Sequence, residues 1–252
     1  MIIHGYDKFE KIRNVKMDLL GIIGGLGPMA TAYFMQLITE MTDAVTDQEH
    51  LRMVIFSAPD IPDRTEYIIG KSDNSPLPGI IEAGLSLKRI GADVIAIPCI
   101  TAHYFQSDIE NGLGITTLNV IAGCCDFLAK LNVKKVGLMA TEGTVKSNLF
   151  QREFKKKGIT VLIPEKKDQD IVTSLIYNDV KKGRDPDMSA FYYVKNRLLQ
   201  SGAEIVILGC TELSVIKRDN DTGDRVLDAM EVLASMAITA CGKKVRKDRC
   251  LL

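Results

Sequence analysis

Two cysteines lie in similar segments of the chain and could act as a pair of acid/base groups. Cys99 and Cys210 each follow a glycine by eight residues, and in both segments alanine, an acidic residue and a short apolar run come between them. Runs rich in valine, isoleucine and leucine are typical of buried parallel strands. Each cysteine is therefore expected at the carboxyl end of a strand, the edge where open α/β sheets bind ligands.

A thiol pair at that edge favours chemistry at a carbon next to a carboxylate. A thiolate is a capable base, and a helix N-terminus can supply the lowered pKa that it needs. One thiolate could remove a proton from one face of the carbon while the opposite thiol returns a proton to the other face, which is racemisation. Donors must stabilise the carbanion, and Thr101 and Thr211 lie within two residues of the cysteines. This chemistry needs no cofactor, and none is expected.

A second pair of matching segments indicates that the fold is duplicated. Residues 20–28 and 136–144 both read as a strand that runs into a turn of small residues and then a helix. The first turn, Gly24-Gly25-Leu26-Gly27, has neither the glycine spacing of a dinucleotide-binding motif nor a P-loop lysine. Its backbone N–H groups could receive a carboxylate. Alternatively, the glycines could serve only the tight packing of a strand against a helix.

Strands and helices alternate along the chain, which predicts an α/β fold with parallel sheets. We expect two similar domains related by pseudo-twofold symmetry, the first over residues 17–120 and the second over 121–221. Residues 1–16 are expected to form an extension, the C-terminal helix 222–242 to complete the first domain, and 243–252 to form a solvated basic tail. The pattern also predicts single helices over 144–157, 168–182 and 225–241, and a helix from Thr101 to Asn111 that follows the Cys99 strand directly.

Composition excludes several classes of partner. The chain has 252 residues, of which 46% are apolar, and its 32 basic and 32 acidic residues cancel, so no bulk charge favours nucleic acid. The first 16 residues are polar and charged, and no apolar run is long enough to span a membrane, so a cytoplasmic protein with reduced thiols is expected. Three scattered histidines and the absence of a Cys-x-x-Cys pair predict no metal site.

Five motifs, taken together from about residue 18 to 241, resemble the aspartate/glutamate racemase family. They are residues 24–31 (GGLGPMAT), 61–65 (IPDRT), 98–105 (PCITAHYF), 138–144 (LMATEGT) and 208–212 (LGCTE). The resemblance implies an amino-acid racemase that works without pyridoxal phosphate on a small acidic substrate, aspartate and possibly glutamate. It also implies two α/β domains with the active site in the cleft between them, and a homodimer.

The resemblance assigns roles to residues of these motifs and to Lys181, which lies in the segment 177–183. Cys99 and Cys210 match the two catalytic thiols. Arg64 and Lys181 match residues that hold substrate carboxylates, and a planar arginine with a flexible lysine suits a diacid. The other expected substrate contacts are Thr101 and Thr211, which match positions at the α-carboxylate, together with Gly25 and Thr141.

Two further residues are possible auxiliaries of the thiols. Glu212 could orient Cys210 or Thr211, or it could simply be favoured at a helix N-terminus. The order Cys-Thr-Glu resembles the aspartate-type branch of the family. The glutamate racemases usually carry Cys-Thr-His at this place. His103 could assist Cys99, although in the motif it reads more as a structural residue.

One residue departs from the family pattern. Ile100 stands where Pro-Cys-Asn-Thr-Ala-His has asparagine, so the amide donors and acceptor are lost and bulk is added. This change leaves open a weaker racemase, a shifted substrate, or a homologue that binds without turnover. The alternatives within the wider superfamily are a hydantoin racemase, a maleate-type isomerase and a decarboxylase.

Overall fold

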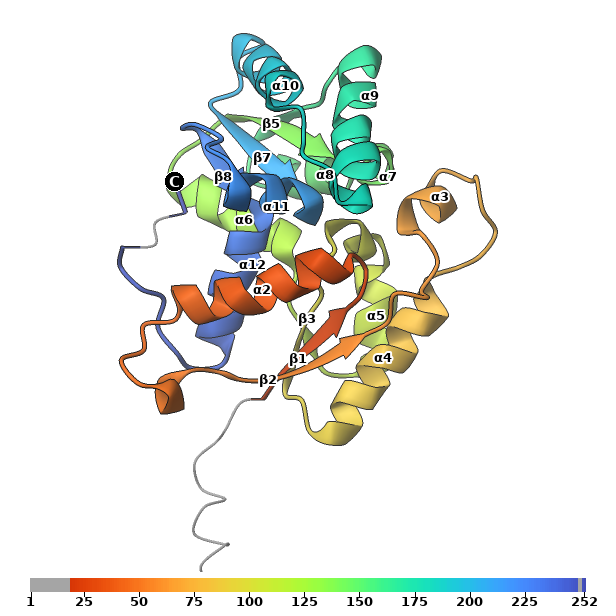
Figure 1. Ribbon diagram of the computed structural model, residues 1–252, viewed down its shortest axis with the longest axis vertical. Coiled ribbons are helices and arrows are strands. Elements are labelled where there is room, and N and C mark those ends of the chain that lie inside the picture. Colours follow the sequence, from red (N-terminus) through yellow and green to blue (C-terminus); the bar gives the residue numbers. More distant parts are fainter. Residues whose placement is uncertain (1–18, 249–250) are drawn as a thin grey trace, which may run out of the picture.

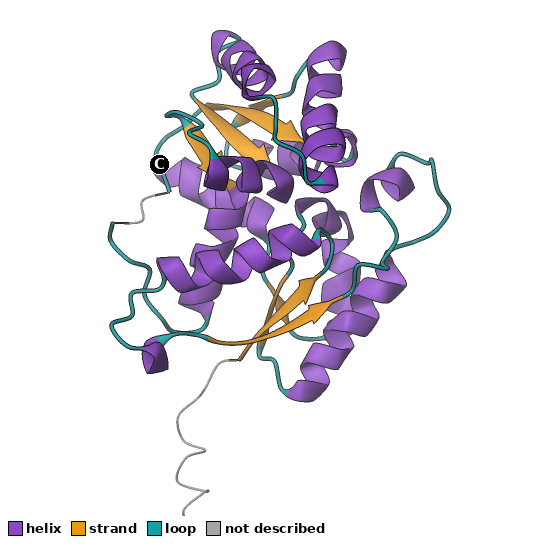
Figure 2. Ribbon diagram, in the orientation of Figure 1, coloured by secondary structure: helices purple, strands orange, loops and turns teal. Residues whose placement is uncertain are grey.

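The computed structural model describes residues 19–248 and 251–252, and the predicted extension over 1–16 lies outside them. Within the described chain, helices and strands alternate and build two parallel four-stranded sheets, each with helices packed on it (Figures 1 and 2). The α/β class with two similar domains, predicted from the sequence, is confirmed. The boundary between the domains near residue 120 stays a prediction.

The two sheets have the same topology. The first has the order β2-β1-β3-β4 and consists of β1 (Leu19–Gly24), β2 (Arg52–Ser57), β3 (Val94–Ala96) and β4 (Thr116–Thr117). The second has the order β6-β5-β7-β8 and consists of β5 (Lys135–Ala140), β6 (Thr160–Leu162), β7 (Ile205–Gly209) and β8 (Val226–Asp228). Each strand of the first sheet thus has a counterpart in the second, and the cysteine-bearing strands β3 and β7 correspond.

The repeated glycine, alanine and acidic residue before β3 and β7 have the same physical function in both halves. Gly91 and Gly202 take left-handed backbone conformations, with φ of 99° and 98°, where the preceding helix ends. Glycine is favoured in this left-handed conformation because it has no Cβ. The acidic side chains then bind the start of the neighbouring strand: Asp93 accepts from the Leu19 N–H at 2.9 Å, and Glu204 from the Lys135 N–H at 2.8 Å.

Helices divide the interior into three apolar layers. Between the sheets lie α2 (Pro28–Met41), α6 (Val120–Lys130), α8 (Leu149–Lys155) and α12 (Ala229–Ala240), whose buried side chains form one core with residues of both sheets (Figure 1). The other face of the first sheet is covered by α4 (Leu77–Ile90) and α5 (Gln106–Leu113), and that of the second by α9 (Lys166–Ser174) and α10 (Met188–Gln200). This shared central core fixes the position of one sheet relative to the other.

The predicted helix over 225–241 is wrong at its start. Val226–Asp228 form strand β8, which pairs with β7, and the helix begins only at Ala229. The Asp228 side chain accepts the Met230 N–H at 2.8 Å and so caps α12, which separates the strand from the helix. The second sheet therefore takes its fourth strand from the segment that the sequence assigned to the C-terminal helix.

Three other predicted helices are interrupted. The one expected from Thr101 to Asn111 is a 3₁₀ helix over Ile100–Phe105, and α5 begins only at Gln106. The expected helix 144–157 is two helices, α7 (Glu142–Lys146) and α8, because Asn148 takes a left-handed φ of 56° between them. The expected helix 168–182 ends as α-helix at Ser174 and continues as a π-helical turn, η4 (Leu175–Asp179), and a 3₁₀ turn, η5 (Val180–Lys182). Such π turns are frequent at functional sites, and this one carries Tyr177.

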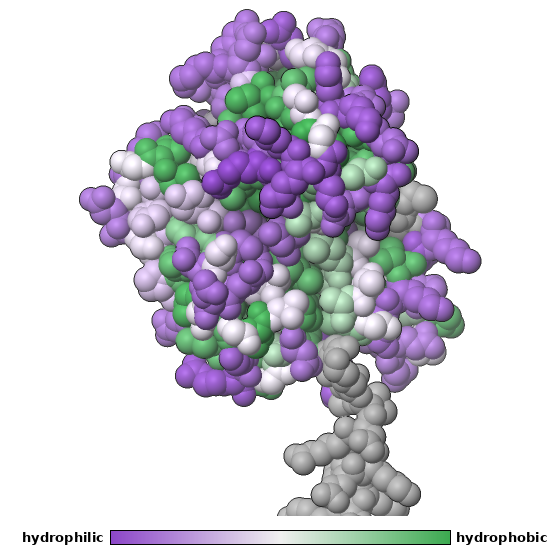
Figure 3. Space-filling view, turned by 180° about the vertical axis from the view of Figure 1, so that it is seen from behind, coloured by the Kyte–Doolittle hydropathy of each residue, from purple (hydrophilic) through white to green (hydrophobic). Residues whose placement is uncertain are grey.

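The described part of the predicted basic tail is not free. Val245 forms an antiparallel bridge with Thr42, the Asp43 N–H donates to the Lys244 carbonyl and the Arg246 N–H donates to the Met41 carbonyl, both at 2.8 Å. Seen from behind, the surface is mixed, with hydrophobic patches scattered among hydrophilic residues (Figure 3). None of the helices in the described chain is long and apolar enough to cross a membrane.

Candidate active site

The two predicted thiols meet at one cavity. Cys99 precedes η3 (Ile100–Phe105), a 3₁₀ helix that follows β3, and Cys210 lies between β7 and α11 (Thr211–Asp219). Both are buried and both line a cavity of about 10 Å³, named here the two-thiol cavity. Six other predicted site residues line it: Arg64, Thr101, Thr141, Lys181, Thr211 and Glu212. Ile100, which was singled out from the sequence, lines it as well, and four lining residues were not predicted to do so: Leu26, Asp63, Thr65 and Tyr177.

Glu212 is a direct partner of Cys210. The Cys210 thiol donates to Glu212 Oε2 at 2.9 Å, and the Thr211 hydroxyl donates to the same oxygen at 3.4 Å. Burial raises the pKa of Cys210 well above its ordinary value, and the Glu212 charge and hydrogen bond raise it further. Cys210 is therefore held as a thiol, next to a carboxylate that can accept its proton.

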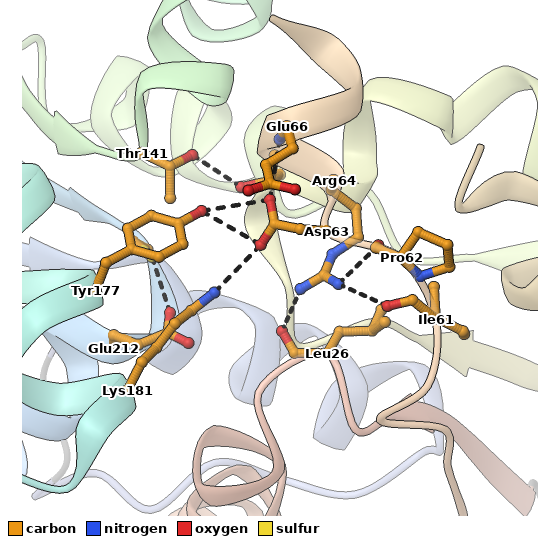
Figure 4. Close-up of polar contacts among 12 residues, drawn as sticks. Leu26, Ile61, Pro62, Asp63, Arg64, Glu66, Thr141, Tyr177, Lys181 and Glu212 are labelled. Atoms are coloured by element: carbon orange, nitrogen blue, oxygen red, sulfur yellow. Dashed lines mark hydrogen bonds and ion pairs between the residues drawn. The ribbon is translucent and has the colours of Figure 1, made fainter. Parts of the chain in front are cut away.

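Arg64 lies on the Cys99 side and binds backbone carbonyls. It begins the short helix α3 (Arg64–Ile68), and its guanidinium donates to the carbonyls of Leu26 (2.8 Å), Pro62 (3.0 Å) and Ile61 (3.3 Å) (Figure 4). Burial opposes the charged form of Arg64, but interactions with Cys99 and Asp63 outweigh it and raise the pKa of the guanidinium. Arg64 thus fixes the β1–α2 turn and supplies positive charge beside Cys99.

Lys181 reaches the cavity already paired. Its ammonium lies 3.5 Å from the Asp63 carboxylate and 4.2 Å from the centre of the Tyr177 ring. The Tyr177 hydroxyl donates to the same carboxylate at 3.4 Å, so Asp63 lies between these two side chains and Arg64 (Figure 4). Burial would raise the pKa of Asp63, but the Glu66 N–H and the charges of Lys181 and Arg64 prevail and lower it. Asp63 is therefore ionised.

Three threonine hydroxyls join the two halves of the molecule beside the thiols. The Thr101 hydroxyl lies 3.0 Å from that of Thr141 and 3.1 Å from that of Thr144, and the last two lie 3.1 Å apart. All three side chains are buried. Hydroxyl groups in such a cluster can turn their hydrogens toward a carboxylate when one arrives.

Two predicted site residues do not reach the two-thiol cavity. Gly25 lines a neighbouring pocket, and its N–H donates to the Thr31 hydroxyl at 2.9 Å. His103 lies with Nδ1 3.1 Å from the Cys99 carbonyl and Nε2 3.3 Å from the Leu118 carbonyl. Burial lowers its pKa, so the imidazole is neutral. His103 holds the backbone of Cys99 and does not contact its thiol.

Sequence reasoning missed Asp63 and Tyr177, because the role of each depends on a partner that is distant in the sequence. Asp63 and Tyr177 are 114 residues apart and meet only in the folded chain. Asp63 lies inside the 61–65 motif beside Arg64. Its charge next to a predicted substrate-binding residue was the signal that could have identified it. Tyr177 and Lys181 are four residues apart, and this spacing places both on one face of a helical turn.

No metal centre is built from the residues that the structure describes, where no group of three or more histidine, cysteine, aspartate or glutamate side chains converges. The two-thiol cavity is lined by sulfur, hydroxyl and charged groups. Ile100 adds an apolar wall to it and is itself buried in the shared central core.

The family model for Asp/Glu/hydantoin racemases matches residues 23–237. Together with the two sheets and the convergence of their thiols, this match defines the class: the chain belongs to the Asp/Glu/hydantoin racemase family.

Named relatives agree with this assignment over most of the chain. The broad specificity amino-acid racemase RacX of Bacillus subtilis (strain 168) is 25% identical, covering 88% of this chain and 97% of its own. The aspartate racemase of Picrophilus torridus is 34% identical with a TM-score of 0.82, covering 92% and 97% of the two chains. A glutamate racemase of Francisella tularensis in complex with D-glutamate shares the fold, at 17% identity and a TM-score of 0.64, with 89% and 81% covered.

Proposed function

We propose that this protein is a cofactor-independent amino-acid racemase that uses Cys99 and Cys210 as opposed acid and base. The observation that carries the proposal is that both thiols line one cavity. Family membership and the likeness to a Picrophilus aspartate racemase support racemase chemistry. Aspartate, and after it glutamate, is the substrate expected from these relatives.

The surroundings of the thiols suit one direction of proton transfer at rest. Cys210 carries its proton, because burial and Glu212 raise its pKa. Cys99 lies beside the positively charged Arg64 guanidinium. In the proposed reaction the Cys99 thiolate takes the α-proton, and the Cys210 thiol delivers its own proton to the opposite face of the carbon.

The reverse reaction needs Cys210 as the base. Glu212 lies within hydrogen-bond distance of its sulfur and can take the thiol proton. The carbanion spreads its charge into the substrate carboxylate, where the hydroxyls of Thr101, Thr141 and Thr211 are the proposed donors. Both half-reactions then use groups that already line the two-thiol cavity.

Binding a diacid requires the walls of the cavity to separate. A volume of about 10 Å³ has room for about one water molecule, and an amino acid is larger. The α3 segment forms one wall, and its Asp63 is held by Lys181 and Tyr177 from the other half of the chain. We propose that the second carboxylate of aspartate shares Lys181 with Asp63 when this contact opens.

The proposal is tested by incubating the protein with each enantiomer of aspartate and glutamate in D₂O. A racemase incorporates deuterium at the α-carbon and forms the opposite enantiomer, which NMR and chiral chromatography detect. A maleate-type isomerase or a hydantoin racemase would leave aspartate unchanged and act on maleate or on a hydantoin. A binding protein would show only a thermal shift with aspartate, and that result would contradict the proposal. We also propose a homodimer, which sedimentation velocity would test.

A further inference from the structure

The two-thiol cavity adjoins a larger pocket that a substrate as short as aspartate would not fill. This outer pocket measures about 570 Å³ and shares with the cavity a wall made of Leu26, Asp63, Arg64, Lys181 and Glu212. A ligand whose α-carbon lies between the thiols can extend past this shared wall. The outer pocket is therefore placed to receive a substrate side chain.

Beyond the shared wall, the lining is mainly apolar. Six of its side chains are Pro28, Met29, Ala30, Ile61, Val180 and Val215. They come from the start of α2, from the segment before α3, from η5 and from α11, so both halves of the chain contribute. An apolar side chain that leaves water for such a surface gains binding energy in proportion to the area it buries.

The charges on the shared wall are already matched. Lys181 pairs with Asp63 at 3.5 Å, Glu212 accepts the Cys210 thiol, and Arg64 donates to three backbone carbonyls. A second carboxylate buried here must compete for these partners, since an unpaired buried charge is costly. A neutral substrate side chain can extend past the shared wall without disturbing these charge pairings.

Ile100 also favours a substrate with a neutral, apolar side chain. It lines the two-thiol cavity at the position where the resemblance expects an asparagine amide. An apolar residue at this place removes one polar contact for an anion and adds one for methylene groups. Because the walls must separate to admit a substrate, an unbranched side chain needs a smaller opening than an aromatic ring.

We propose that the protein racemises amino acids with linear apolar side chains, of the methionine class, in addition to acidic ones. This inference rests on the proposed racemase function, because it uses the same two thiols. The α-ammonium and α-carboxylate stay in the two-thiol cavity while the side chain occupies the outer pocket. The Cα–H bond breaks as the Cys99 S–H bond forms, and the Cys210 S–H bond breaks as a new Cα–H bond forms on the opposite face.

The first experiment measures α-deuterium incorporation from D₂O into both enantiomers of methionine, aspartate and phenylalanine. We expect exchange into methionine that the double variant Cys99→Ser/Cys210→Ser abolishes, and slower exchange into phenylalanine. Exchange into aspartate without exchange into methionine would overturn the inference and leave the racemase function standing. Exchange into none of the three would overturn both, and methionine exchange that survives the double variant would exclude this site as its source.

A matched pair of variants tests the outer pocket itself. Met29 and Met35 are both exposed on α2, at 62% and 47%, and of the two only Met29 lines the outer pocket. Met29→Gln keeps the length of the side chain but makes it polar, so the kcat/KM ratio of methionine over aspartate should fall about fivefold. Met35→Gln should leave the ratio unchanged. An unchanged ratio in Met29→Gln, or an equal fall in both variants, would overturn the use of this pocket.

Discussion

At the scale of single residues, the two thiols differ in their neighbours although the segments that carry them match. Cys210 donates to Glu212, whereas Cys99 lies beside the Arg64 guanidinium. Two equivalent cysteines in a symmetric environment would share one protonation state. These unlike neighbours distinguish the two thiols before substrate arrives, which suits the proposed one-acid, one-base mechanism.

Glu212→Gln should move the alkaline limb of the pH profile of kcat/KM to lower pH. After burial, the charge of Glu212 is the largest cause of the raised Cys210 pKa, so a neutral amide lowers that pKa and the catalytic acid is lost earlier as pH rises. Because the equilibrium constant of a racemisation is one, kcat/KM must change equally for both enantiomers. Rates measured between about pH 6 and 10 test this. An alkaline limb that stays in place would contradict it, and Glu82→Gln, on the exposed face of α4, is the control.

Ile100→Asn should raise kcat/KM for aspartate about tenfold, because an amide donor can bind a carboxylate where isoleucine cannot. The variant should also melt at a lower temperature, since Ile100 packs in the shared central core. Ile100→Val is the matched control, because it creates space without an amide and should not improve turnover. Equal kinetics in the asparagine and valine variants would show that this position does not limit the site.

The sequence revealed the two proposed catalytic thiols but not all of their partners. Cys99 and Cys210 could be found because each ends a segment with the same buried-strand pattern. The pairing of Asp63 with Lys181 could not be found, because it depends on how α3 and η5 pack. The same limit applies to Arg64, whose conformation directs it to carbonyls of its own segment and of the β1–α2 turn.

At the scale of elements, the link between β8 and α12 holds a buried carboxylate. Asp228 is fully buried, accepts the Ser214 hydroxyl at 2.6 Å and caps α12. Burial and the nearby Glu231 raise its pKa to about 6. This link joins the last strand of the second sheet to a helix of the shared central core, so its protonation bears on the stability of both halves.

Asp228→Asn should weaken the pH dependence of stability between about pH 4 and 7. The folded protein holds the Asp228 proton more tightly than the unfolded chain. The contribution of this proton to the free energy of unfolding is therefore complete below about pH 4 and is lost as pH rises through about 6. A shift of about two units corresponds to about 3 kcal/mol. The asparagine variant cannot ionise, so its melting temperature should fall less than that of the wild type over this range. Parallel melting curves would contradict the assignment.

The elements that sequence analysis described wrongly share a physical cause. Val226–Asp228 is a strand of only three residues, and its apolar residues also fit the helical period of the segment that follows. The break at Asn148 rests on one left-handed residue inside a run that otherwise favours helix. Long buried strands such as β1, β5 and β7 leave a stronger pattern, and a strand is expected from the sequence in all three segments.

At the scale of the whole molecule, duplication explains why one site needs both halves of the chain. In each sheet a cysteine follows the corresponding strand, β3 or β7, and the shared central core brings both cysteines to one cavity. The threonine cluster and the contact of Asp63 with Lys181 and Tyr177 cross the same boundary. The approach of the two halves therefore also assembles the proposed acid/base pair.

Hydrogen exchange from single enantiomers in Cys99→Ser and Cys210→Ser tests this account most directly. Each variant retains one base at most, so each should lose racemisation and exchange the α-hydrogen of one enantiomer only, with opposite enantiomers for the two variants. Cys241→Ser, a cysteine that does not line the two-thiol cavity, should behave as the wild type. Racemisation at the wild-type rate in either Cys99→Ser or Cys210→Ser would contradict the paired-thiol site.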